Sequence, residues 1–113
     1  LNPSKAVTER FTNPHTALSL AMIETHYFLN KAFIGPDQIL RNMYKLAGIP
    51  GMIVHGRYDM CCPYDNAWSL HRAWPGSELY SIRDAGHASC EPGILDALIN
   101  ATEMMAASLG ANR

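Results

Sequence analysis

The chain has 113 residues, of which 48% are apolar, and its formal net charge is −1. This length suffices for about one folded domain, and the apolar content argues against disorder. With 9 lysines and arginines against 10 acidic residues and no basic stripe, the composition argues against a nucleic-acid partner. No apolar run approaches the ~20 residues of a membrane span and no signal peptide opens the chain, so we expect a cytoplasmic protein without membrane contact.

The cysteines are Cys61, Cys62 and Cys90. An odd number with two adjacent members is a poor basis for a disulfide framework, so reduced thiols in the cytoplasm are the simpler interpretation. The sequence contains no Cys-x-x-Cys or His-x-x-x-His pair. It therefore predicts no metal site, and we expect no cofactor.

The first half of the chain predicts helices. The first dozen residues show no clear period and are expected to form a connection. Pro14 opens a helix with Asn13 as its cap, and apolar residues then recur at three- and four-residue steps as far as Phe28. Glu24 projects from or beside this apolar face, where a carboxylate is costly unless it is paired.

The second half alternates between helix and strand. After a break at residues 30–36, the pattern predicts a helix at 37–47 ended by Gly48, a strand at 52–54, a helix at 65–74, a strand at 78–82 and a helix from Glu91. This order indicates right-handed βαβ units on a parallel sheet, so the expected fold class is α/β. Because two strands are too few for an independent parallel sheet, the chain either pairs with another copy or belongs to a larger sheet.

Two polar side chains follow the two predicted strands. Asp59 ends the segment Ile53-Val54-His55-Gly56-Arg57-Tyr58-Asp59, and His87 ends Asp84-Ala85-Gly86-His87. Reactive groups of open α/β sheets lie just past the carboxyl ends of the strands, where a carboxylate can orient a histidine base. Alone, each residue is more often a turn or structural residue. Together, in this order, they predict the acid and the base of a hydrolase triad.

No serine of the chain is suited to be the nucleophile of that triad. The sequence has no Gly-x-Ser-x-Gly motif, and Ser69 and Ser89 lack the flanking glycines of a strained strand-to-helix turn. A glycine-rich oxyanion loop is also missing. We therefore expect the chain alone to be inactive toward acyl substrates.

Other residues near Asp59 are weaker candidates. Cys62 comes three residues later, so its thiol is expected near the site, where modification would block substrate; an inert buried thiol is the alternative. His55, at the end of the strand, is a candidate support for the Asp59 loop. Arg57 either pairs with a carboxylate near the site or is simply exposed.

Residues 49–59 resemble the late acid segment of the prolyl aminopeptidases, also called proline iminopeptidases. The resemblance continues through Cys62-Pro63, Ala73-Trp74-Pro75, Ala85-Gly86-His87 and Glu91-Pro92 to about residue 105. Upstream, residues 23–28 are similar to the family's Ile-Glu-Asn-His-Tyr-Phe segment, with Thr25 in place of asparagine. The His-Gly-Arg-Tyr-Asp string is specific to this family among α/β-hydrolases.

These enzymes are serine peptidases of the α/β-hydrolase fold with a helical cap, which release N-terminal proline from peptides and need no metal. The resemblance implies that Asp59 is the triad acid, that His87 is the general base, and that Glu24 binds the substrate's free α-amino group. A structural salt bridge is the alternative for Glu24. The resemblance also implies that the serine elbow, the oxyanion loop and most of the cap precede residue 1.

We accordingly expect residues 1–48 to form the end of the cap region with connecting helices, and residues 49–113 the C-terminal part of the α/β-hydrolase core. Two other functions stay open. The same fold also carries esterases, epoxide hydrolases and dehalogenases, which need no amine-binding glutamate. Alternatively, the chain is a non-catalytic piece that assembles through its open sheet edge with a second copy or with the N-terminal part of its parent.

Overall fold

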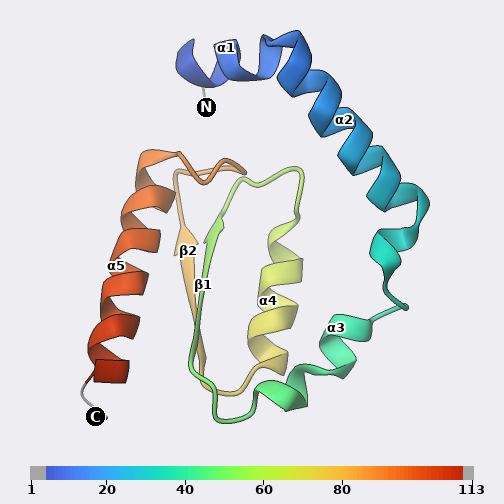
Figure 1. Cartoon of the computed structure of the whole chain (residues 1–113). Coiled ribbons are helices and arrows are strands. Elements are labelled where there is room, and N and C mark those ends of the chain that lie inside the picture. The colour runs from blue at the N-terminus through green and yellow to red at the C-terminus, as the bar shows by residue number, and fades with distance from the viewer. Residues whose placement is uncertain (1–4, 111–113) are drawn as a thin grey trace. The chain divides into compact units, whose positions relative to one another are not determined.

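The structure, a computed structural model, describes residues 5–110 of the chain. They form two compact units, one up to Gln38 and one from Ile39 onward, and each is described by itself. The elements in chain order are α1 (Lys5–Thr12), α2 (Pro14–Leu29), the 3-10 helix η1 (Lys31–Phe33), α3 (Gln38–Arg41), the 3-10 helix η2 (Met43–Leu46), β1 (Gly51–Gly56), α4 (Tyr64–Ala73), β2 (Ser77–Ile82) and α5 (Pro92–Gly110) (Figure 1). No helix within residues 5–110 is long and apolar enough to cross a membrane.

Two parallel strands form the centre of the second unit. β1 and β2 pair in register from Gly51 opposite Ser77 to Gly56 opposite Ile82, and α4 is the crossover between them. α4 and α5 lie on opposite sides of the strand pair (Figure 1). The predicted α/β class and the parallel pairing are confirmed. The arrangement is compatible with the C-terminal part of an α/β-hydrolase.

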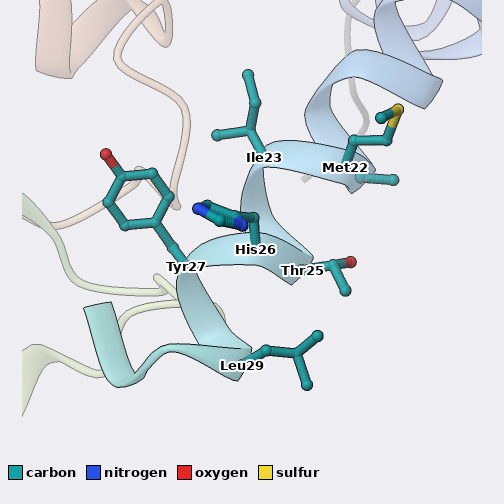
Figure 2. Close-up of a pocket in the computed structure, with 7 residues that line it drawn as sticks. Met22, Ile23, Thr25, His26, Tyr27 and Leu29 are labelled. Carbon is teal, nitrogen blue, oxygen red and sulfur yellow. The ribbon is translucent and has the colours of Figure 1, made fainter. Parts of the chain in front are cut away.

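Helix α2 begins where the sequence predicts. Asn13 Oδ1 accepts the backbone N–H groups of His15 at 3.0 Å and Thr16 at 3.3 Å, so it caps the helix. At the other end, Asn30 Nδ2 donates to the His26 carbonyl at 2.8 Å. No residue of α2 is buried, and the side chains in Figure 2 project from several sides of the helix. Local capping therefore defines this helix, rather than packing of one apolar face within its unit.

The prediction that the first dozen residues form a connection is wrong for residues 5–12, because α1 spans Lys5–Thr12. Residues 1–4 lie outside the described part of the chain. Lys5 Nζ lies 3.8 Å from Glu9 Oε1 one turn later, and Thr12 Oγ1 donates to the Thr8 carbonyl at 3.0 Å. These contacts are short-range and polar. The first dozen residues show no clear apolar period, which is why the sequence pattern did not predict this helix.

The single helix predicted at residues 37–47 is also wrong, because the segment is divided into α3 and η2. The Asn42 N–H donates to the Ile39 carbonyl and the Lys45 N–H to the Asn42 carbonyl, both at 3.0 Å. This three-residue spacing belongs to a 3-10 turn, which interrupts an α-helix. Gly48 follows with a φ of +81°. It therefore ends the segment in the left-handed conformation that glycine adopts without strain.

The core of the second unit is small. Its buried residues have mostly small or medium side chains: Met43, Ala67, Ser77, Ala85, Ile94 and Ala101. Larger apolar residues such as Ile39 and Tyr44 are 58% and 69% exposed. The strands and helices of this unit thus leave much of their apolar surface uncovered.

Candidate active site

The loops that follow β1 and β2 run side by side. The hydrogen bonding continues past the strands, since the Tyr58 N–H donates to the Ala85 carbonyl at 2.9 Å. Gly56 lies at the closest approach, where a Cβ would overlap the carbonyl oxygens of Gly86 and Ala85. Glycine is therefore required here because the backbones of the two loops are in contact.

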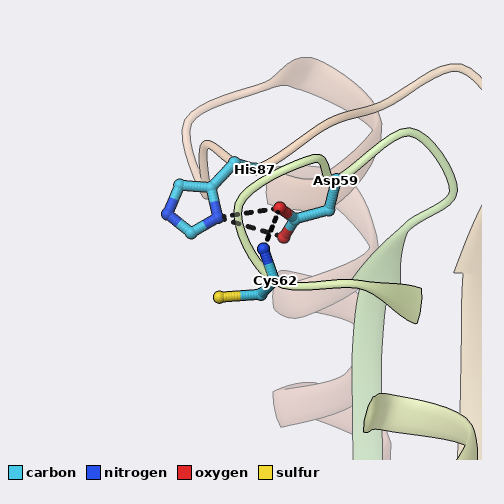
Figure 3. Close-up of side chains that lie close together, drawn as sticks. All are labelled: Asp59, Cys62 and His87. Atoms are coloured by element: carbon cyan, nitrogen blue, oxygen red, sulfur yellow. Dashed lines mark hydrogen bonds and ion pairs between the residues drawn. The ribbon is translucent and has the colours of Figure 1, made fainter. Parts of the chain in front are cut away.

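This contact brings Asp59 and His87 together. Nδ1 of His87 lies 3.0 Å from Oδ2 and 3.1 Å from Oδ1 of Asp59 (Figure 3). Because an ionised carboxylate only accepts hydrogen bonds, Nδ1 carries the proton of the neutral ring. Nε2 then has a lone pair, and the His87 side chain is 58% exposed. The arrangement can remove a proton from a group placed next to Nε2.

The carboxylate of Asp59 is held by the main chain of its own loop. Its side chain is 7% exposed, and Oδ1 accepts the backbone N–H groups of Cys61 at 2.9 Å and Cys62 at 2.8 Å. Burial raises the pKa of Asp59, but the hydrogen bonds from Cys62, His87 and Cys61 together hold this pKa below its ordinary value. Asp59 is therefore ionised at neutral pH.

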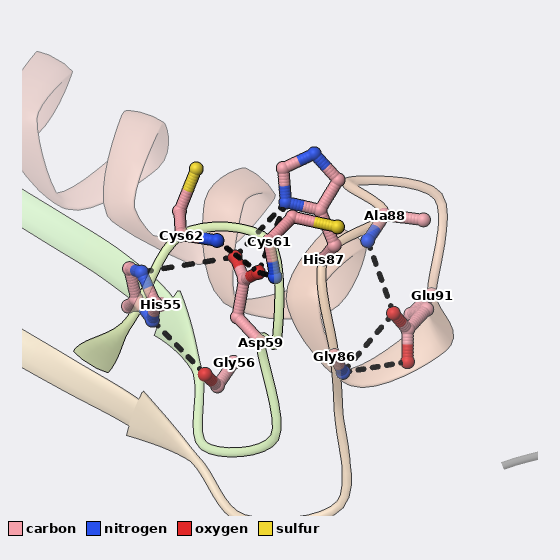
Figure 4. Close-up of polar contacts among 9 residues, drawn as sticks. All are labelled: His55, Gly56, Asp59, Cys61, Cys62, Gly86, His87, Ala88 and Glu91. Carbon is pink, nitrogen blue, oxygen red and sulfur yellow. Dashed lines mark hydrogen bonds and ion pairs between the residues drawn. The ribbon is translucent and has the colours of Figure 1, made fainter.

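His55 lies on the other side of Asp59. Its Nδ1 is 2.9 Å from the Gly56 carbonyl oxygen, which can only accept, so Nδ1 is the donor (Figure 4). Nε2 faces Asp59 Oδ2 at 3.8 Å, and the ring meets Tyr64 edge to face with 5.7 Å between centroids. The side chain predicted to support the Asp59 loop therefore contacts both the end of the strand and the carboxylate.

The part played by Glu91 was missed by sequence reasoning. Its carboxylate accepts the Gly86 N–H at 2.9 and 3.0 Å and the Ala88 N–H at 3.1 Å (Figure 4). These hydrogen bonds hold the residues on either side of His87. The available signal was that Glu91 stands directly before Pro92, a position that predicts a helix cap. The spacing does not reveal that the side chain turns back toward the preceding loop.

Cys62 lies at the site. Ligand atoms of Asp59, Cys62 and His87 all lie within 4.8 Å of one another (Figure 3). The three cysteines are free and exposed, so Cys62 is not a buried thiol among the described residues.

The Arg57 guanidinium lies over the Tyr64 ring, 5.4 Å from its centroid.

Glu24 lies in α2, in the first unit, whereas Asp59 and His87 lie in the second, and the two units are not placed relative to one another. The Glu24 side chain is exposed, and within residues 5–110 it makes no ion pair. Its neighbours, including Ile23 and Tyr27, line an open apolar hollow of about 670 Å³ (Figure 2). Both the amine-binding role of Glu24 and its alternative, a structural salt bridge, stay predictions.

No protein-family model matches the sequence. The chain is 53% identical over 92 residues to a proline iminopeptidase of Xylella fastidiosa, a match that covers 80% of the chain and 29% of the relative. It is 46% identical over 110 residues to a proline iminopeptidase of Arabidopsis thaliana, covering 96% of the chain and 28% of the relative. It is 47% identical over 103 residues to a probable proline iminopeptidase of Leptolyngbya boryana, covering 90% of the chain and 32% of the relative.

The chain thus spans less than a third of the length of these relatives. The resemblance predicted from the sequence is confirmed: over most of its own length, the chain is similar to a part of proteins that are named proline iminopeptidases.

Proposed function

We propose that this chain is part of a serine exopeptidase that releases N-terminal proline from peptides, with Asp59 as the triad acid and His87 as the general base. The observation that carries the proposal is the 3.0 Å contact between His87 Nδ1 and the Asp59 carboxylate, past the ends of two parallel strands. The similarity to proline iminopeptidases supports the choice of reaction and of substrate class.

In this role, His87 Nε2 takes the proton of a serine hydroxyl as its oxygen attacks the prolyl carbonyl carbon. The same proton is then donated to the departing amine, and a water molecule repeats the cycle to release the proline. Asp59 keeps the proton of the neutral ring on Nδ1 and stabilises the imidazolium that forms. The serine and the oxyanion hole belong to the parent protein outside this chain, so the chain alone is inactive.

Glu24 recognises the substrate's amino group in this proposal. An N-terminal proline carries a secondary ammonium group. This group donates hydrogen bonds to a carboxylate and attracts it through its positive charge. The Glu24 carboxylate is exposed and makes no ion pair within the described range, and its neighbours line an apolar hollow that suits the pyrrolidine ring. A requirement for this ammonium would restrict cleavage to the first residue of a peptide.

The proposal also includes the organisation of the parent protein. Residues 1–48 form the end of the cap region, and residues 49–113 form the C-terminal part of the catalytic core. The rest of the parent covers the apolar side chains that are exposed here, such as Phe28 at 77% and Ile39 at 58%. The three exposed thiols suit a reducing compartment, and we therefore place the parent in the cytoplasm.

The test is hydrolysis of a prolyl chromogenic amide by the parent protein. His87→Ala should lower kcat by about 10⁴-fold or more, because the base is lost, while the circular dichroism spectrum and Tm stay unchanged. His15→Ala, at an exposed position of α2, is the matched control and should keep full activity. Retained turnover in His87→Ala would contradict the triad assignment.

A further inference from the structure

We propose that Asp59, Cys62 and His87 form a binding site for a soft divalent cation of the Zn²⁺ type, and that an ion bound there switches off the general base. The effect on activity rests on the proposed function, whereas the binding of the ion does not. The sequence predicted no metal site because it has no Cys-x-x-Cys or His-x-x-x-His pair. The third ligand here comes from a different loop, 28 residues along the chain from Asp59.

The three side chains offer one carboxylate oxygen, one thiol sulfur and one imidazole nitrogen, all within 4.8 Å of one another. A tetrahedral zinc ion with bonds of roughly 2.0 Å to nitrogen and oxygen and 2.3 Å to sulfur separates its ligand atoms by roughly 3.3–3.5 Å. Cys62 and His87 are both exposed, so small side-chain rotations can close this gap. Three protein ligands leave a fourth position for water.

Asp59 provides the fixed ligand of this set. Its carboxylate is held by the N–H groups of Cys61 and Cys62 at 2.9 and 2.8 Å, so its oxygens are in place before an ion arrives. The nitrogen of His87 that faces Asp59 is Nδ1, at 3.0 Å. An ion between these atoms takes the place of the proton that joins them in the catalytic arrangement.

The consequence for the base follows from the count of ring hydrogens. A neutral imidazole carries one N–H, and coordination through Nδ1 forces that hydrogen onto Nε2. Nε2 can then no longer accept a serine proton. When the ion binds, the Cys62 thiol loses its proton to solvent and the His87 proton moves from Nδ1 to Nε2. The net change is one proton released per ion, with no electron transfer.

The binding test uses Co²⁺ as a spectroscopic probe on the parent protein. The expected result is a thiolate-to-cobalt absorption band in the near ultraviolet that saturates with one ion per chain and is displaced by Zn²⁺. Cys62→Ser should abolish the band and weaken binding at least 10-fold. Cys61→Ser and Cys90→Ser, which remove the other exposed thiols, should keep it. A band that persists in Cys62→Ser, or no band in the unaltered protein, would overturn the proposal.

The activity test measures hydrolysis of a prolyl amide at rising Zn²⁺ concentrations, each variant relative to its own metal-free rate. Inhibition should be reversed by a chelator, and Cys62→Ser should raise the half-inhibiting concentration at least 10-fold. Equal sensitivity in Cys62→Ser would contradict the link between the site and the base. If the parent protein hydrolyses no prolyl substrate, the proposed function fails, and the Co²⁺ titration still decides the metal site.

Discussion

The loops after β1 and β2 differ sharply from helix α2 in how their side chains are held. In the loops, Asp59 accepts hydrogen bonds from two backbone N–H groups and from the His87 ring. Glu91 accepts hydrogen bonds from the N–H groups on both sides of His87. In α2, no residue is buried, and Glu24 makes no ion pair within residues 5–110. Asp59 and His87 are thus positioned by residues of their own unit, whereas no ion pair within residues 5–110 positions Glu24, the proposed amine-binding residue.

The most direct way to break the site of the second unit is to separate its two loops. Gly56→Val places a branched side chain where even a Cβ overlaps the carbonyls of Gly86 and Ala85. We expect a loss of stability of about 1–3 kcal/mol. We also expect kcat to fall at least ~100-fold, because His87 is displaced from Asp59. Urea unfolding and prolyl amide kinetics of the parent protein measure both effects.

Gly110→Ala is the control for this substitution, because a Cβ there meets no atom within 4 Å. It should leave kcat unchanged and should not lower stability. If Gly56→Val kept the stability and kcat of the unaltered protein, contact between the two loops would not be what holds the pair.

The variant Glu24→Gln tests the proposed amine-binding role of helix α2, the other region of the comparison. Glu24→Gln removes one charge-assisted hydrogen bond of about 1.5–3 kcal/mol, so kcat/KM for a prolyl amide should fall roughly 10- to 100-fold. Stability should not change, because the side chain is exposed. Glu103→Gln, an exposed carboxylate on α5, is the matched control. Unchanged prolyl turnover in Glu24→Gln would favour an esterase, epoxide hydrolase or dehalogenase instead.

Glu91 tests whether the loop of His87 is held from within its unit. Glu91→Ala leaves the N–H groups of Gly86 and Ala88 without their carboxylate acceptor, which should cost about 1.5–3 kcal/mol of stability. Because His87 itself stays, we expect kcat to fall only about 10-fold, with little change in KM. A larger effect on KM than on kcat would show that Glu91 acts on substrate binding rather than on the base.

The smallest effect concerns pH. Because the folded-state pKa of Asp59 is lowered, its ionisation contributes stability that is fully present above the unfolded-state pKa and is lost as pH falls through the folded-state value. The stability difference between the unaltered protein and Asp59→Asn should therefore be constant from neutral pH to about pH 4. Below that pH the difference should shrink. If the stability difference already shrank between pH 7 and 5, the lowered pKa of Asp59 in the folded protein would be contradicted.

The parallel pair and its crossover could be predicted because their signals are local. Buried strands leave unbroken apolar runs such as Met52-Ile53-Val54, and Pro92 marks a helix start that needs no tertiary information. The meeting of Asp59 and His87 could be expected from the rule that strand ends share an edge. Helix α1 was missed because the first dozen residues show no clear apolar period in the sequence.

The contacts of Glu91 could not be predicted from the sequence for a different reason. They depend on which way its side chain turns within a loop, which spacing along the chain does not encode. The apolar face predicted for α2 is a separate case. Its pattern describes what the helix is able to bury, and within its own unit no residue of the helix is buried.

The two backbone N–H groups that hold Asp59 leave protein engineering considerable freedom at this site. Every residue except proline supplies a main-chain N–H, so the acid does not require the thiol that stands beside it at position 62. Libraries that vary this side chain can therefore change the size and polarity next to the Asp59–His87 pair without removing the N–H donors that orient the carboxylate.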